Sequence, residues 1–254
     1  MTFEERLSPQ PGFKETLIGK GIELVIFDFD DTLIATREIF LAQMNEFCAQ
    51  VVSLSPELIL SELKDMAEKS NNRSFVRYGV NPRKWTHVVE ELVVECGEKH
   101  RSSISKAYPH LERIYTIPPV LKNGAQALLD QSSGEGVRLG LVTHANERWT
   151  HFKLDSSGLR KYFEKIIIIS EDGHKTGEEW RKAISEFGVE PWEVLVIGDN
   201  IRGDIQAFYE AGVRHLVWFD EGDGWSIYRQ GELPPETIVI HTLADLPGAL
   251  IGNS

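Results

Sequence analysis

The sequence predicts an α/β fold, in which a Rossmann-like parallel sheet forms the core and an all-helical cap domain is inserted into it. Three observations support this prediction. Short apolar runs alternate with helical segments, a long stretch without a good strand separates the first two runs, and polar residues directly follow several runs. The chain has 254 residues, of which 41% are hydrophobic, so it can bury a core of ordinary size.

The first predicted strand is the nearly continuous apolar run at residues 22–27, which is typical of a strand buried on both faces of a parallel sheet. Further strands are predicted at residues 137–143, 166–169, 194–197 and 215–219, with a weaker run at 238–240. Helices are predicted between them at residues 122–131, 178–187 and 204–211. This alternation favours right-handed βαβ units.

The stretch between the first two strands is too long for a simple crossover, and it has a helical pattern throughout. Thr36 is placed to cap one helix, and Pro56 and Pro82 each follow a polar residue at the start of another. The pair Pro118-Pro119 cannot lie inside a helix and marks the return to the core. We therefore predict a core domain of residues 1–35 and 117–254, and a helical cap of residues 36–116.

The chain is acidic, with 39 Asp and Glu against 27 Lys and Arg and a formal net charge of −12. Such a field repels nucleic acid and anionic membrane surfaces, so neither is expected as a partner. No apolar run is long enough to span a bilayer, and the N-terminal residues do not resemble a secretory signal. We therefore expect a cytoplasmic protein. The oligomeric state is not predicted.

An acidic cluster, Asp28-Phe29-Asp30-Asp31, directly follows the first predicted strand. The carboxyl ends of parallel strands are where open α/β sheets bind their ligands. Three acids in four positions repel one another, so they require a cation, a shared proton or full exposure to water. A solvated acidic turn is the alternative interpretation, but the position after a buried strand favours a functional site.

Three further motifs lie beside later strands. Thr143 ends the second strand, Lys175 precedes a helix, and Asp199 and Asp204 form a Gly-Asp-x-x-x-x-Asp pattern after the fourth. With Asp28-x-Asp30-x-Thr32-Leu33, these positions resemble the four ordered motifs of the haloacid dehalogenase-like hydrolase superfamily. The resemblance covers the chain outside the cap. Two positions depart from the common pattern, His144 where many members have Asn and Thr176 where many have Pro.

The hydrolysis of a phosphate ester would explain why acidic residues gather at these strand ends. An anionic ester resists attack by a carboxylate, so Asp28 as nucleophile requires a divalent metal, and carboxylates such as Asp28 and Asp199 suit Mg²⁺. The resemblance implies that the backbone carbonyl of Asp30 is a further metal ligand. Asp204 is either another ligand or an acid that supports the ligands, and we favour the second role.

Catalysis is expected to proceed through an aspartyl-phosphate on Asp28. Asp30 is the candidate general acid and base, because it lies two residues from the nucleophile. Thr143 and Lys175 are candidates to bind the phosphoryl oxygens and to stabilise their charge. The predicted catalytic residues are therefore Asp28, Asp30, Thr143 and Lys175.

An Asp at position 30 also reduces the number of reactions that the chain could catalyse. Relatives that cleave carbon–halogen bonds or phosphonates, or that pump ions, lack an acid two residues past the nucleophile. A phosphatase acting on a small phosphorylated metabolite is thus predicted, with a phosphomutase or a non-catalytic binding protein as alternatives. The cap offers several cations for a second anionic group of the substrate, namely Arg37, Arg73, Arg77, Arg83, Lys84 and His87.

Overall fold

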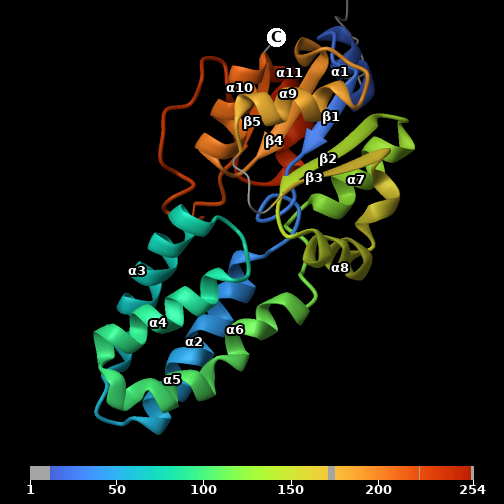
Figure 1. Cartoon of the computed structure of the whole chain (residues 1–254). Coiled ribbons are helices and arrows are strands. Elements are labelled where there is room, and N and C mark those ends of the chain that lie inside the picture. Colours follow the sequence, from blue (N-terminus) through green and yellow to red (C-terminus); the bar gives the residue numbers. More distant parts are fainter. Residues whose placement is uncertain (1–11, 171–174, 223, 253–254) are drawn as a thin grey trace, which may run out of the picture.

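The computed structural model describes residues 12–170, 175–222 and 224–252. Six parallel strands form one sheet in the order β3-β2-β1-β4-β5-β6 (Figure 1). The strands are β1 (Leu24–Phe27), β2 (Arg138–His144), β3 (Lys165–Ile169), β4 (Val194–Gly198), β5 (His215–Phe219) and β6 (Ile238–Ile240). The predicted α/β class with a parallel sheet is confirmed.

Strand β1 is the point at which the sheet reverses its order. Leu24 is paired with Arg138 of β2 on one side and with Val194 of β4 on the other. All four residues of β1 are buried, as expected for a central strand covered on both faces. Ligands bind at the carboxyl end of such a switch point, which is where Asp28 follows.

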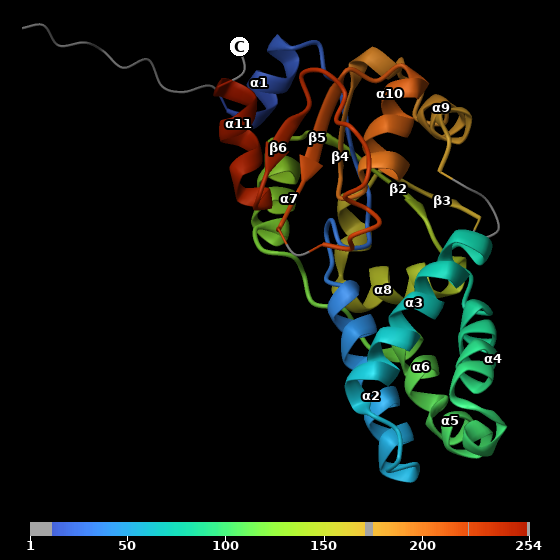
Figure 2. The same ribbon diagram turned by 90° about the vertical axis from the view of Figure 1, so that its left-hand side faces the viewer.

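Two layers of helices cover the sheet. Val25 and Phe27 of β1 pack into one hydrophobic cluster, and Leu24 and Ile26 pack into the other, because successive side chains of a strand alternate between faces. The first layer consists of α1 (Phe13–Gly19), α7 (Ala125–Gly134), α8 (Glu147–Ser157) and α11 (Leu246–Gly252), and the second of α9 (Gly177–Ser185) and α10 (Ala207–Ala211). Figure 2 shows α1, α7 and α11 on one side and α9 and α10 on the other.

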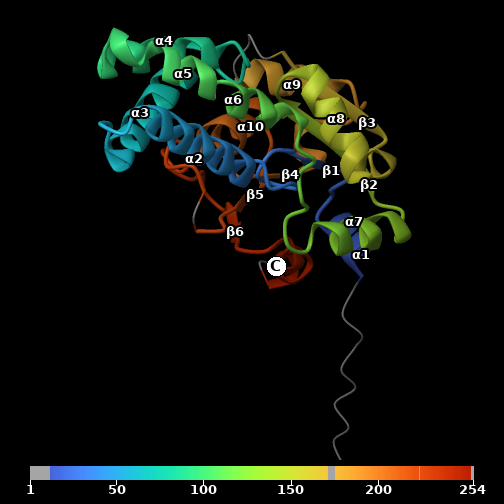
Figure 3. The ribbon, with the colours of Figure 1, turned by 90° about the horizontal axis from the view of Figure 1, so that it is seen from below.

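Residues 36–116 contain helices and no strand, as the sequence predicts. These helices are α2 (Arg37–Leu54), α3 (Leu60–Tyr78), α4 (Lys84–Cys96), α5 (Arg101–Ala107) and α6 (Pro109–Arg113). They share a third hydrophobic cluster, which includes Phe47, Leu63 and Leu92 and is joined by Trp149 of α8. They lie beyond the carboxyl end of β1 in Figure 1, and in front of the sheet in the view from below (Figure 3). The division into a cap and a core domain stays a prediction.

Short 3₁₀ segments complete the chain at Glu98–His100, Ile114–Thr116, Leu159–Tyr162, Pro191–Glu193 and Leu243–Asp245. The helix predicted at residues 204–211 differs in detail, because it starts earlier as a π-helix at Ile201–Gln206. The amides of Asp204 and Ile205 both donate to the carbonyl of Asn200, which widens this turn. No helix in the described ranges is long and apolar enough to cross a membrane.

Candidate active site

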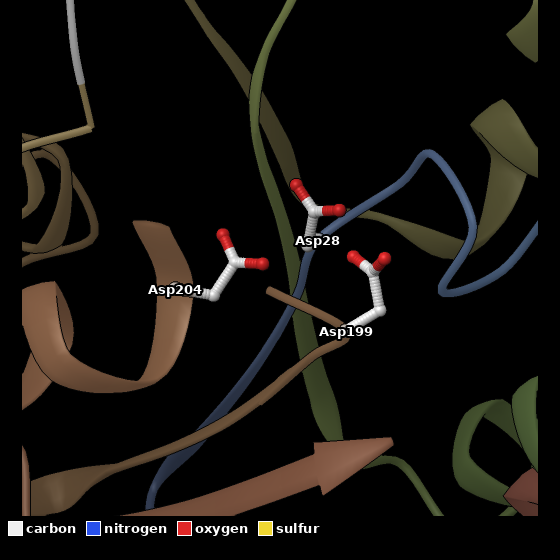
Figure 4. Close-up of side chains that lie close together, drawn as sticks. All are labelled: Asp28, Asp199 and Asp204. Carbon is white, nitrogen blue, oxygen red and sulfur yellow. The ribbon is translucent and has the colours of Figure 1, made fainter. Parts of the chain in front are cut away.

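Three carboxylates converge at the carboxyl end of the sheet. Asp28 follows β1, Asp199 follows β4, and Asp204 lies in the π-helix, and one oxygen from each lies within 4.8 Å of the others (Figure 4). The neighbouring strands β1 and β4 bring Asp28 and Asp199 together, since the Asp28 amide donates to the Ile197 carbonyl at 2.9 Å. The predicted proximity of these two acids is thus observed.

Lys175 is the cation of this group. Its Nζ lies 3.1 Å from Oδ1 of Asp28 and also donates to Oδ1 of Asp204. Burial lowers the pKa of Lys175, but its ion pairs with Asp204 and Asp28 outweigh burial and hold the pKa above its usual value. Asp204 is completely buried, and its Oδ2 accepts a hydrogen bond from the Asn200 amide at 3.1 Å.

One lysine does not neutralise three acids. Asp28 is only 2% exposed, and burial raises its pKa to about 7 although Lys175 acts in the opposite direction. The pKa of Asp199 is raised well above its usual value by burial and then by the nearby Asp31, Asp204 and Asp28. Such a site favours a bound cation, and a donor set made only of oxygen atoms fits a hard ion such as Mg²⁺.

Two glycines permit this close approach. A Cβ atom at Gly198 would lie 2.7 Å from the Cβ of Asp204, and a Cβ at Gly203 would lie 2.8 Å from Cδ of Lys175. Neither distance is tolerable for carbon atoms. The glycines of the segment 198–204 are therefore required by packing around Asp204 and Lys175.

Asp30 lies outside the three-carboxylate group and has different partners. Its Oδ1 accepts hydrogen bonds from Oγ1 of Thr36 at 2.5 Å and from Nζ of Lys153. Lys153 lies on α8, is completely buried, and stacks over the Trp149 ring at 3.7 Å. Two donors thus fix one oxygen of the candidate general acid and base.

Asp31 has a structural role at the start of α2. It adopts a left-handed backbone with φ 59°, and its Oδ1 accepts from the amides of Thr36 and Arg37 at the start of α2. Its Oδ2 accepts from Nε1 of Trp225 at 3.0 Å. Burial raises the pKa of Asp31 to about 6, against the hydrogen bond from the Arg37 amide. Asp31 therefore connects the Asp-rich loop to α2 and to a distant loop.

A cavity of about 360 Å³ opens over these residues. It is lined by the predicted site residues Asp28, Asp30, Thr143, Lys175 and Asp199. Thr143 is 1% exposed and reaches the cavity from the end of β2, whereas Asp204 does not line it. Residues of α3 and Lys84 of α4 also line it. A volume of this size suits a small molecule.

Sequence reasoning missed several residues of this site. Lys153 lies one helical turn after Trp149 and beside Leu154, so the apolar spacing of α8 carried a signal that it is buried. Trp225 and Tyr228 also line the cavity, but they belong to a loop between β5 and β6 whose pattern indicates no contact with the site. The residues 171–174, which precede Lys175, lie outside the described ranges.

The doubly covered parallel sheet and the acidic group at its switch point are features expected of the haloacid dehalogenase-like hydrolases that the sequence motifs resemble. The model of that family, described as haloacid dehalogenase-like hydrolase, matches residues 22–212. The chain belongs to this family. The resemblance that the sequence motifs indicated is thereby confirmed, as is the prediction of an enzyme.

Known relatives agree with this assignment. A glyceraldehyde 3-phosphate phosphatase from Pyrococcus abyssi is 28% identical over 210 residues, which cover 79% of this chain and 82% of the relative. A phosphoserine phosphatase from Thermus thermophilus is 30% identical over 139 residues, 53% of this chain and 54% of the relative. These names support the predicted class of phosphoric monoester hydrolases. A haloacid dehalogenase-like hydrolase from Xanthomonas campestris shares the fold with a TM-score of 0.70 at 18% identity, covering 92% of this chain and 93% of that one.

Proposed function

We propose that this protein is a Mg²⁺-dependent phosphatase that hydrolyses a small phosphomonoester through an aspartyl-phosphate on Asp28. The observation that carries this proposal is the position of the Asp28 carboxylate. It lines the cavity, it is ion-paired to Lys175, and it lies beside Asp199 at the end of the neighbouring strand. The phosphatase relatives are consistent with this chemistry.

Mg²⁺ would be held by the carboxylates of Asp28 and Asp199 and the carbonyl of Asp30, and it would supply the charge that lets an anionic nucleophile approach an anionic ester. Asp204 accepts hydrogen bonds from Lys175 and from the Asn200 amide and does not face the cavity. We therefore assign it the role of positioning Lys175.

In the first step, an oxygen of Asp28 forms a bond to phosphorus as the bond to the leaving oxygen breaks. Asp30 donates a proton to that leaving oxygen, held in place by Lys153 and Thr36. In the second step, water attacks the phosphorus of the aspartyl-phosphate and gives its proton to Asp30, which restores the Asp28 carboxylate. Lys175 and the Thr143 hydroxyl contact the phosphoryl oxygens throughout.

The test is the release of inorganic phosphate from p-nitrophenyl phosphate in the presence of Mg²⁺. Replacement of Asp28 by Asn removes the nucleophile and is expected to abolish release, whereas Asp65→Asn makes the same chemical change on an exposed position of α3 and should leave it intact. Activity that survives in Asp28→Asn would refute the assignment of the nucleophile. Trapping of labelled phosphate on the acid-quenched parent, but not on Asp28→Asn, would identify the intermediate directly.

A further inference from the structure

Lys84 is a buried lysine in the wall of the cavity that Asp28 also lines. It is the first residue of α4, its relative exposure is 4%, and it lines the cavity. Among the described residues, no carboxylate is within ion-pairing distance of its Nζ. Three rings surround the ammonium instead, with centroids at 4.9 Å for Trp85, 5.2 Å for Phe40 and 5.6 Å for Phe75.

An ammonium in this environment is costly. Burial without an anionic partner lowers the pKa of Lys84 to about 7, and the attraction of the ring faces offsets only part of the lost hydration. An anion that entered the cavity would supply the missing partner. With a pKa of about 7 the side chain is only partly protonated near neutral pH, and a bound anion would favour its ammonium form.

The other cations predicted for the cap do not line this cavity. Arg73 is paired with Glu91 and Glu95 on the surface, and His87 stacks on Tyr78 at 4.0 Å. Arg37, Arg77 and Arg83 are likewise absent from its walls. Lys84 alone among the six candidates can contact a molecule that is bound at Asp28.

Two further polar atoms in the cavity walls lack a protein partner. Oδ1 of Asn71 and Nε1 of Trp149 are buried and make no hydrogen bond. Both residues line the cavity, and they are 5% and 7% exposed. Buried polar groups are nearly always hydrogen-bonded, so an acceptor and a donor left open beside a cavity are suited to a bound molecule.

We propose that Lys84 binds a second anionic group of the substrate, so that the substrate is a small phosphate monoester with a carboxylate or a further phosphate at its other end. This inference rests on the proposed function, because the ester phosphate at Asp28 sets the orientation. The substrate lies between two cations, with Lys175 at the reacting phosphate and Lys84 at the second anion. Asn71 and Trp149 can bind a hydroxyl or an amino group on the carbon frame between them.

Non-hydrolysable phosphonates test the site without turnover. Calorimetry is used with 3-phosphonopropionate, which has a carboxylate end, propane-1,3-bisphosphonate, which has a phosphonate end, and 3-hydroxypropylphosphonate, which has a neutral end. The parent is expected to bind at least one of the two probes that have a second anionic group roughly 10- to 100-fold more tightly than the probe with a neutral end, as a charge-assisted contact allows. Which of the two binds more tightly identifies the second anion.

The variant Lys84→Met keeps the length of the side chain and removes its charge. In this variant the probes with a second anionic group should bind about as weakly as 3-hydroxypropylphosphonate, whose own affinity should not change. The thermal midpoint of the variant should be equal to that of the parent or higher, because a buried charge is lost. Lys84→Gln provides a second neutral side chain if the Met variant does not fold. Arg202, an exposed residue of the cavity wall, gives the matched comparison as Arg202→Gln, which should keep the preference.

An equal loss of affinity for all three probes in Lys84→Met would overturn the proposal, as would a preference that disappears in Arg202→Gln instead. A parent without preference would overturn it too. The protein is also assayed for phosphate release from 2-phosphoglycolate, 2-hydroxyethyl phosphate and p-nitrophenyl phosphate. If it releases none but still shows a binding preference that depends on Lys84, the second-anion site is supported and the phosphatase proposal is contradicted. The two failures are therefore distinguishable.

Discussion

Lys153 donates a hydrogen bond to Asp30 from a position without any exposure to solvent. The lysine comes from α8, after the second strand of the sheet, and the aspartate comes from the loop after the first. A buried ammonium with one carboxylate partner is held firmly, because either charge alone would be costly to bury. The pair fixes the direction of the Asp30 carboxylate relative to Asp28.

Replacement of Lys153 by Met is expected to reduce kcat more for substrates with poor leaving groups than for substrates with good ones. Phosphate release from an alkyl phosphate needs a proton from Asp30 and should fall about 100-fold in kcat, whereas p-nitrophenolate leaves without one and should lose far less. The measurement is the ratio of kcat for the two substrates in the parent and the variant. Lys161→Met, at an exposed position, is the control. Equal losses for both substrates would mean that Lys153 serves stability alone.

A side chain at Gly198 should disturb Asp204. In Gly198→Ala the new methyl group would lie 2.7 Å from the Asp204 Cβ, and relief of this clash is expected to cost about 1–3 kcal/mol of unfolding free energy. Denaturant unfolding of the variant measures the loss. Gly134→Ala, where nothing lies within 4 Å, should be neutral or slightly stabilising. If both variants unfold at the same denaturant concentration, the packing at Gly198 is looser than described.

Mg²⁺ is expected to stabilise the folded protein. A ligand that binds only the folded state raises the unfolding free energy by roughly 2.7 kcal/mol at a concentration 100 times its dissociation constant. Differential scanning fluorimetry should show a rise of the midpoint with Mg²⁺ in the parent and a much smaller rise in Asp199→Asn. The same rise in both proteins would remove Asp199 from the metal site.

Affinity for Mg²⁺ should depend on pH through Asp28. Because the pKa of Asp28 is raised to about 7, a proton occupies much of this ligand below that pH and competes with the metal. Protonation disfavours binding, and the pKa of the second proposed ligand Asp199 is raised as well, so the apparent affinity should rise at least about tenfold from pH 6 to pH 8. Titrations of Mg²⁺ by calorimetry at these pH values measure the change. A constant affinity over this range would show that Asp28 is ionised without the metal.

The sequence was sufficient for the sheet and for the proximity of Asp28 and Asp199. Buried parallel strands have apolar runs, and polar residues that end neighbouring strands must meet at one edge. The contact of Asp31 with Trp225 could not be predicted in this way. It joins residues far apart in the chain, and the loop that carries Trp225 has no periodic pattern that defines its path.

The choice of Lys84 among the cap cations also required the structure. Charge alone makes Lys84 and Arg73 equivalent in the sequence. They differ because Arg73 reaches the surface carboxylates of α4, whereas Lys84 is enclosed by Phe40, Phe75 and Trp85. The partners of a side chain depend on how helices pack, which helical spacing does not specify.

The central position of β1 sets an order for folding. Leu24 emerges early during synthesis, but its pairing partners Arg138 and Val194 emerge much later, so the sheet cannot close until most of the chain has been made. The helices α2 to α6 make contacts that are local in sequence and can form sooner. We therefore expect the nascent chain to expose the unpaired apolar strand β1 beside helices that have already folded. The chain should be most prone to aggregation during the time between the synthesis of β1 and that of its partner strands.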